Sequence, residues 1–114
     1  MKKTVSIKVN NHFKYLYAKG STIVCPYFIL YYKKNNKNIR QLGITVSKKI
    51  GNAVVRNRAK RVLKEAYRLL ELQIKNGYDF VLVSRSKTPA VSSVIIKNDL
   101  FYALKKKELL DSGS

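Results

Sequence analysis

The chain has 114 residues, enough for one domain with a single core. Hydrophobic residues make up 46% of it, which supports a globular fold. Lys and Arg number 24 against 6 Asp and Glu, a formal net charge of +18, and no acid precedes Glu65. Such a field attracts polyanions. Composition therefore favours a nucleic acid, or more weakly an anionic membrane surface, without choosing between DNA and RNA.

The single cysteine, Cys25, excludes an intramolecular disulfide and a cysteine-based zinc site, and it fits a reducing cytoplasm. Because it lies in an apolar run, we expect a small buried side chain rather than a nucleophile. Lys8, Asn10 and Asn11 interrupt the beginning of the chain, which argues against a signal peptide. No apolar run approaches the roughly 20 residues of a membrane span. We expect a cytoplasmic protein.

The chain begins with a basic arm over residues 1–9 that we expect to be loosely ordered. A short helix follows, because Phe13, Leu16 and Tyr17 recur at helical spacing. Leu16 is ordinary core material. Phe13 and Tyr17 lie one turn apart, and they either join the core or line a groove.

Two β-rich segments, 21–32 and 42–47, are separated by a polar turn over 33–38. We expect these segments to form a hairpin, with a kink at Pro26 in the first of them. The second half of the first segment is apolar or aromatic on both faces. One face packs on helices, whereas the tyrosines of the other, Tyr31 among them, lie at a core edge or stack on unpaired bases.

A long helix over about 53–75 carries the clearest pattern in the chain. Its apolar residues share one arc: Val55, Ala59, Val62, Leu63, Ala66 and Leu70. Its opposite arc is polar and almost wholly cationic: Arg56, Asn57, Arg58, Lys60, Arg61, Lys64 and Arg68. Like charges four residues apart repel, whereas a solvated helix normally mixes signs. A polyanion is the simplest partner, and a merely soluble basic face is the alternative.

A buried strand over 78–84 and a last helix that begins at Ser92 or Ser93 complete the chain, and residues 111–114 should fray. The order α-β-β-β-α-β-α predicts an α+β fold in one domain over residues 1–114. We expect a four-stranded, mostly antiparallel sheet with helices on one side. Residues 42–84 form a strand–helix–strand crossover.

The residues for hydrolysis by the protein itself are missing. A nuclease would need paired carboxylates or a histidine pair. His12 is the only histidine, and the six acids are scattered along the sequence without forming a recognisable constellation. We expect a binding protein with no catalytic residue and no metal site.

The stretch from Val46 to Arg61 resembles the signature of the bacterial ribonuclease P protein subunit. That family has an Arg-Asn-Arg motif, matched by Arg56-Asn57-Arg58, and a following Lys-Arg, matched by Lys60-Arg61. Element order and length agree as well. The resemblance implies an α/β sandwich like the second domain of ribosomal protein S5. It also implies a left-handed crossover through the motif helix, an exception to a strong rule.

The resemblance further implies a role in a ribonucleoprotein endonuclease that removes the 5′ leader from precursor tRNA. The RNA subunit of that enzyme catalyses the hydrolysis with Mg²⁺. The positions that would contact the catalytic RNA are Lys48, Lys49, Asn52, Arg56, Asn57, Arg58, Lys60, Arg61, Lys64 and Arg68. A leader-binding cleft would be lined by Phe13, Tyr17 and Tyr31. The implied partners are ribonuclease P RNA and precursor tRNA, with no membrane and with a monomeric protein.

The sequence departs from the family pattern at a few positions. Gln41 stands where an arginine is common, and the neighbouring Arg40 should point to the other face of its strand. Lys64 replaces a frequent arginine, which exchanges a bidentate phosphate contact for a point charge. Tyr17 stands where phenylalanine is common, and it retains a ring for stacking.

Three other interpretations fit parts of the sequence. A ribosomal or ribosome-assembly protein could have the same fold and charge without a processing role. A small protein-only nuclease would cleave RNA unaided. A DNA-binding module ranks last, because nothing resembles a helix-turn-helix or a zinc finger.

Overall fold

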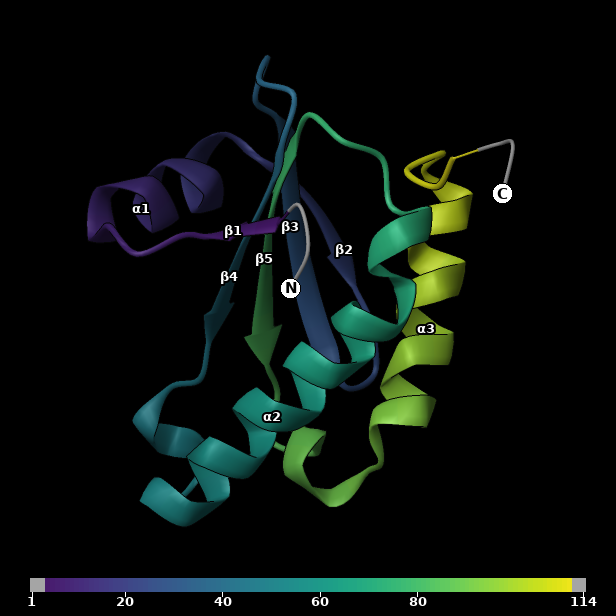
Figure 1. Ribbon diagram of the computed structural model, residues 1–114. Coiled ribbons are helices and arrows are strands. Elements are labelled where there is room, and N and C mark those ends of the chain that lie inside the picture. The colour runs from purple at the N-terminus through teal and green to yellow at the C-terminus, as the bar shows by residue number, and fades with distance from the viewer. Residues whose placement is uncertain (1–3, 112–114) are drawn as a thin grey trace.

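A computed structural model describes residues 4–111 as one five-stranded sheet with three helices (Figure 1). The strands are β1 (Thr4–Ser6), β2 (Ser21–Val24), β3 (Phe28–Lys34), β4 (Arg40–Thr45) and β5 (Tyr78–Ser84). The helices are α1 (Asn10–Lys19), α2 (Ala53–Leu70) and α3 (Ser93–Lys106). Short 3₁₀ turns lie at Lys48–Ile50, Glu71–Gln73 and Thr88–Ala90. The expected α+β class is confirmed.

The strand order β1-β4-β5-β3-β2 corrects the expected sheet. β5 lies between β3 and β4, antiparallel to β3 and parallel to β4, so the hairpin predicted around residues 33–38 is wrong. β5 is buried along both faces, which fits its central position between β3 and β4. The hairpin is instead β2–β3, with Pro26 in its turn. Since β1 and β4 are also parallel, the sheet is mixed rather than mostly antiparallel.

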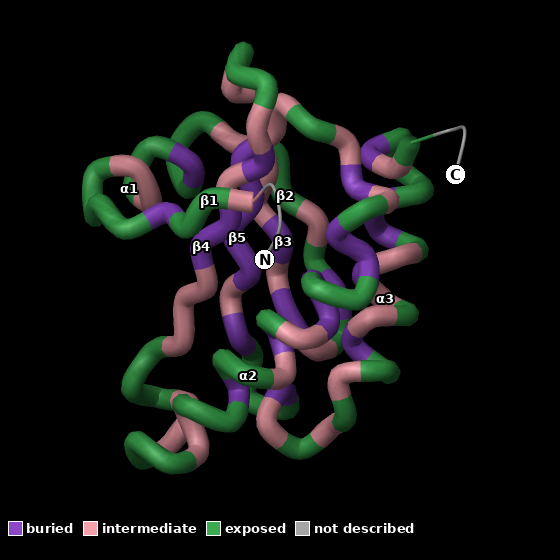
Figure 2. Tube along the Cα trace, in the orientation of Figure 1, coloured by how far each residue is buried: buried purple, intermediate pink, exposed green. Residues whose placement is uncertain are grey.

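The helices cover both faces of the sheet, not one as expected (Figure 1). α2 and α3 pack on the face that carries Leu30, Phe80 and Leu82, and they form the larger core with it. α1 packs on the opposite face, where Leu16 meets Val81. Figure 2 shows the buried residues gathered on the central strands and on the inner sides of the helices. This two-sided cover follows from central strands whose two faces are both apolar.

The beginning of the chain is more ordered than the arm expected over residues 1–9. Residues 4–6 form the edge strand β1, and Ile7 is buried against α1. Thr4 hydrogen-bonds to the hydroxyl of the buried Tyr67, with 3.1 Å between the two oxygens. Residues 1–3 lie outside the described part, so the expectation for them stays a prediction.

The end of the chain differs in a similar way from the expected fraying tail over residues 111–114. The backbone N–H of Asp111 donates to the carbonyl of Gln73 at 2.8 Å, and Leu110 pairs with Ile74. Residues 112–114 lie outside the described part.

α2 begins at Ala53 as predicted, because the side chain of Asn52 caps it by accepting from the N–H of Val55 at 3.0 Å. It ends at Leu70 instead of about residue 75. The chain then leaves the helix so that Ile74 can enter the core. The predicted apolar arc of α2 is confirmed, and Tyr67 is buried with it.

The crossover from β4 through α2 to β5 is left-handed. Both strands run downward in Figure 1, β4 lies to the left of β5, and α2 passes in front of the sheet. A right-handed crossover with the helix in front would place β5 on the other side of β4. The handedness implied by the family resemblance is therefore present.

Cys25 is buried in the larger core, as expected. Burial raises the pKa of its thiol, which disfavours the reactive thiolate. In the described part of the chain, no helix has the length and apolar composition needed to cross a bilayer.

We expect Leu63→Ala to lower the free energy of unfolding by about 2–5 kcal/mol, because Leu63 is fully buried between α2 and the sheet. Urea denaturation measures the change. Leu72→Ala is the matched control, since Leu72 is 74% exposed, and its effect should stay within about 0.5 kcal/mol. Equal losses in the two variants would contradict the assignment of the apolar arc of α2 to the core.

Candidate RNA interface

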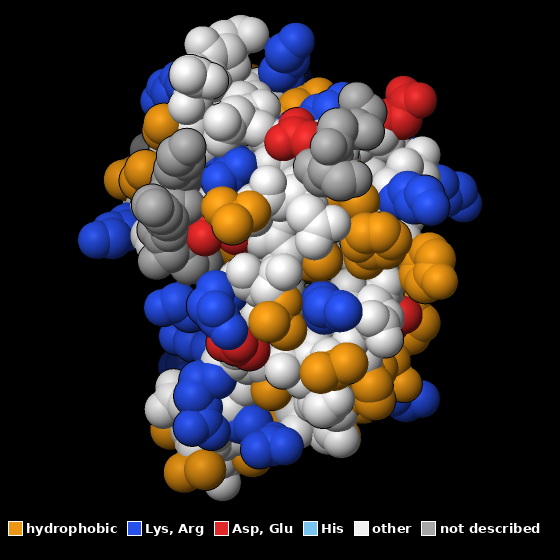
Figure 3. All heavy atoms as spheres, turned by 45° about the vertical axis from the view of Figure 1, so that its right-hand side comes forward, with side chains coloured by type: hydrophobic (Ala, Val, Ile, Leu, Met, Phe, Trp, Pro, Cys, Tyr) orange, Lys and Arg blue, Asp and Glu red, His pale blue; other side chains and the backbone are white. Residues whose placement is uncertain are grey.

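The outer side of α2 presents a basic face, which we define by seven residues: Arg56, Asn57, Arg58, Lys60, Arg61, Lys64 and Arg68. All except the half-buried Arg56 are exposed. The buried arc of the same helix fixes this orientation, because the two arcs lie on opposite sides of the helix axis. Figure 3 shows Lys and Arg side chains gathered at the lower left of the molecule and hydrophobic side chains along its right.

Two members of the basic face already have protein partners. The Nε of Arg58 donates to the carbonyl of Pro89 at 2.7 Å, which ties α2 to the 3₁₀ turn before α3. Arg68 pairs with Glu65 one turn earlier, with Nε 3.0 Å from Oε2. The hydrogen bonds from Arg68 lower the pKa of the Glu65 carboxyl, so this acid stays ionised and offsets one charge of the face.

The basic face continues past the beginning of α2. Lys48 and Lys49 are exposed on the preceding 3₁₀ turn, and the exposed Asn52 caps the helix. The Nε of Arg56 is buried and has no hydrogen-bond partner among the described residues. A helix N-terminus offers free N–H groups and a partial positive charge, so this end suits an anion.

The three aromatic residues expected to line a cleft do come together. The ring centroids of Phe13 and Tyr17 are 6.4 Å apart, and those of Tyr17 and Tyr31 are 4.9 Å apart, edge to face. The Tyr17 hydroxyl lies 2.6 Å from the hydroxyl oxygen of Thr45, which links α1 to β4. A hollow of about 410 Å³ lies beside Phe13 and Tyr17, and Lys14 and Thr45 also line it. Tyr31 does not line this hollow and packs instead against the smaller core.

A buried carboxylate holds the other side of α1 against the sheet. Nε2 of His12 lies 2.6 Å from Oδ2 of Asp79 on β5. Oδ1 of Asp79 accepts from the side-chain amides of Gln41 at 2.6 Å and Asn35 at 2.9 Å. Gln41 therefore belongs to the anchor of α1.

Arg40 lies on the opposite face of β4, as expected, but it is only 3% exposed. Its Nη1 donates to the carbonyl of Ile74 at 2.7 Å. This hydrogen bond of the guanidinium stabilises the fold at that end of the sheet. Neither Arg40 nor Gln41 presents its side chain to the hollow beside Phe13 and Tyr17.

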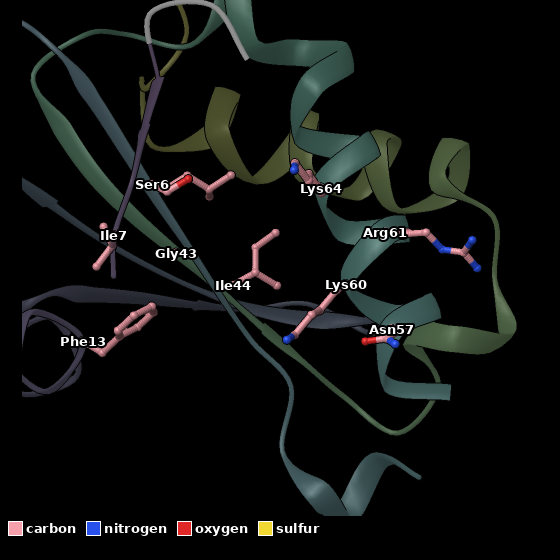
Figure 4. A pocket seen from close by; sticks show the side chains of 10 residues that line it. Ser6, Ile7, Phe13, Gly43, Ile44, Asn57, Lys60, Arg61 and Lys64 are labelled. Carbon is pink, nitrogen blue, oxygen red and sulfur yellow. The ribbon is translucent and has the colours of Figure 1, made fainter. Parts of the chain in front are cut away.

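A second hollow, of about 500 Å³, lies at the edge of β4 between α1 and α2 (Figure 4). Phe13 approaches it from α1, Lys60 approaches it from α2, and Gly43 and Ile44 lie between them (Figure 4). Phe13, Ile44 and Lys60 line both hollows. The aromatic cleft therefore continues around β4 into the basic face of α2.

Some residues of this surface were not foreseen from the sequence. Ile7 lies among polar residues without a period, so it gave no signal. Gly43 interrupts an apolar strand, which is a signal for close approach: a Cβ there would lie 2.6 Å from Cζ of Phe13. The partners of His12 are distant in sequence, and only the fold brings them together.

Within residues 4–111, no three His, Cys, Asp or Glu side chains gather around a point where a metal ion could bind. The Mg²⁺ of the family resemblance is assigned to the RNA, and that assignment stays a prediction.

Comparison with known proteins identifies the family. The family model described as ribonuclease P matches residues 1–108. The chain belongs to the ribonuclease P protein family. A ribonuclease P protein component from a Thermoanaerobacter species is 38% identical over 108 residues, with 95% of this chain and 93% of the relative covered. One from Clostridium kluyveri is 40% identical over 105 residues, with 90% and 94% covered.

Solved structures of family members have the same fold. The Staphylococcus aureus RNase P protein superposes with a TM-score of 0.80 at 32% identity, covering 93% of this chain and 97% of that one. The Thermotoga maritima RNase P protein gives 0.78 at 28% identity, with 89% and 96% covered. The family resemblance, first noted for the segment that contains Arg56-Asn57-Arg58, is thus confirmed over nearly the whole chain.

We expect His12→Ala to lower the free energy of unfolding by about 1–3 kcal/mol, because it leaves the buried Asp79 carboxylate without one of its donors. Thermal or urea unfolding measures this loss. Asn11→Ala is the matched control, since Asn11 is an exposed neighbour in α1. If both variants were as stable as the parent protein, His12 would not anchor the helix.

We expect Glu65→Gln to tighten RNA binding a few-fold, because it frees Arg68 from its ion pair and removes the acid beside the basic face. The slope of log K against log salt should steepen by up to about 0.7–0.9, the increment of one further phosphate contact. Filter binding over a salt series measures both. Asp111→Asn changes the charge equally beyond the end of α3 and should have a smaller effect. Equal changes in the two variants would indicate a general charge effect.

Proposed function

We propose that this protein is the protein component of ribonuclease P, and that it holds the RNA subunit and the 5′ leader of precursor tRNA on one continuous surface. One observation carries the proposal: the aromatic cleft and the basic face meet at β4 through Phe13, Ile44 and Lys60. A single RNA-binding domain that presents both features side by side can hold two RNA segments close together.

The basic face is assigned to the RNA subunit. Its positive side chains recur at successive turns of α2, and Lys48 and Lys49 extend the series beyond the N-terminus. Neutralising phosphates releases counterions, which drives binding to any structured polyanion.

The aromatic cleft is assigned to the leader. Unpaired bases stack on aromatic rings, and such stacking tolerates sequence changes because every base has a flat face. Phe13 and Tyr17 border the hollow from α1, and Thr45 and Val46 border it from the chain of β4 and just beyond, so a single strand would lie between α1 and the end of β4. Tyr31 supports the Tyr17 ring from the sheet, edge to face. Mature tRNA lacks the leader, so this cleft would favour the precursor over the product.

Catalysis is assigned to the RNA subunit with Mg²⁺, and the protein supplies binding and charge. Cationic side chains near the joined RNA segments offset phosphate repulsion, which lowers the Mg²⁺ concentration that the RNA needs. The protein would act in the cytoplasm, and alone it would be a monomer. The function is thus that of a non-catalytic subunit of an endonuclease.

The test is cleavage of a precursor tRNA at low Mg²⁺ by a bacterial ribonuclease P RNA, with and without this protein. We expect stimulation that needs both components. Tight binding to RNA without stimulation would favour a ribosomal or ribosome-assembly role. Cleavage by the purified protein alone would favour a protein nuclease.

We expect Phe13→Ala and Tyr17→Ala each to weaken precursor binding by the reconstituted enzyme by about 1–3 kcal/mol, the contribution of one base stack. Binding of mature tRNA should not change. Tyr102→Ala is the matched control, because Tyr102 is an aromatic residue of α3 that is 70% exposed. If precursor and mature tRNA were weakened equally, the cleft would not be the leader site.

A further inference from the structure

The hollow at the edge of β4 exists because β1 stops short. β1 pairs with β4 only from Arg40 to Leu42, and the carbonyl of Leu42 accepts from the N–H of Ile7 at 2.9 Å. Backbone groups alternate in direction along a strand, so those of Ile44 face the same side as those of Leu42. At Ile44 the described chain provides no further strand on that side. One N–H and one C=O therefore face the hollow.

The walls of the hollow have two kinds of chemistry. Its floor is apolar, formed by Ile7, Phe13 and Ile44. Its rim is polar and cationic, formed by Asn57, Lys60, Arg61 and Lys64 from α2 together with Ser6 from β1. The Phe13 ring lies against the backbone of β4 at Gly43, where a Cβ would collide with it (Figure 4).

A nucleotide matches this combination. A base has flat apolar faces for the floor, a hydrogen-bonding edge for the backbone of Ile44 and the side chains of Ser6 and Asn57, and a phosphate for Lys60 and Lys64, whose side chains extend to the hollow side of α2 (Figure 4). A free inorganic anion has no apolar surface with which to contact the floor. An apolar peptide would leave the cationic rim unpaired.

We propose that this hollow is a pocket for one unpaired nucleobase of RNA, separate from the aromatic cleft and joined to it through Phe13. The inference rests on the proposed function, which brings RNA to both sides of β4. The base belongs either to the leader or to the RNA subunit, and the chemistry of the pocket is the same for both. The two sources are distinguished by experiment.

The test is to fill the pocket with a larger side chain. Ser6 is exposed at its rim, so Ser6→Tyr places a ring in the hollow without disturbing the core. Val5→Tyr is the matched control, because Val5 is the neighbouring exposed residue of β1 and points to the opposite face of the sheet. Both variants are compared with the parent protein in the reconstituted enzyme after circular dichroism has confirmed that they fold.

For a leader base, Ser6→Tyr should weaken precursor binding roughly 5- to 100-fold, the range of one lost base contact, and leave mature tRNA unaffected. An abasic nucleotide at one leader position should cause a similar loss with the parent protein. The two losses should not add when combined. If Ser6→Tyr fails to fold, the smaller Ser6→Leu fills the hollow in its place, and its loss should likewise not add to that of the abasic nucleotide.

For a base of the RNA subunit, Ser6→Tyr should weaken assembly with that RNA in the absence of any substrate. One nucleotide protected from chemical modification by the parent protein should become reactive with the variant. The pocket is overturned if Ser6→Tyr behaves as Val5→Tyr in both assays, or if neither RNA contains a base whose removal weakens binding. Stimulation of cleavage by the parent protein is measured in parallel, because its failure would contradict the proposed function itself.

Discussion

Like charges recur along the basic face of α2 and repel one another, and the packing of the other elements has to compensate for this repulsion. Positive side chains at successive turns destabilise an isolated helix, and within residues 4–111 Glu65 is the one acid of α2 that pairs with them. Burial of the opposite arc compensates for this repulsion: Leu63, Ala66, Tyr67 and Leu70 pack into the larger core. The sheet therefore holds a helix whose outer charges suit a polyanion, and bound RNA would relieve the repulsion that the fold tolerates.

For the aromatic cleft and the basic face to adjoin, α1 and α2 must also keep a fixed distance from each other, although they lie on opposite faces of the sheet. Leu16 packs α1 onto β5, and hydrogen bonds from His12 and Tyr17 hold its two sides. β1 covers only the first half of β4. The second half stays open, so the basic face and the aromatic cleft meet along one strand edge. A longer β1 would separate them.

The sequence was sufficient for features with a strong local period. The two arcs of α2 follow from helical spacing, and both appear as predicted. The aromatic cluster of Phe13, Tyr17 and Tyr31 followed from the family resemblance, and its members do meet. Local patterns succeed here because each side chain's environment is set by its own element.

Strand pairing could not be predicted from local sequence patterns in the same way. β3 and β4 are neighbours in sequence, so a hairpin was the local expectation, but the doubly apolar β5 takes the place between them. The side on which α1 packs depends on that arrangement as well. β1 has too few residues for a period, and Asp79 acquires His12, Gln41 and Asn35 as partners only in the folded chain. These features depend on long-range contacts that no window of sequence contains.

The proposal that the leader lies in the aromatic cleft is tested most directly by cleavage from a tethered iron chelate in the reconstituted enzyme. Because Cys25 is buried, a cysteine placed by Lys14→Cys can be labelled selectively in the aromatic cleft, and Tyr102→Cys provides a control on α3. We expect the probe at position 14 to cut the leader of bound precursor tRNA, and the probe at position 102 to leave the leader intact. Equal cutting from both positions, or none from position 14, would contradict the assignment of the cleft to the leader.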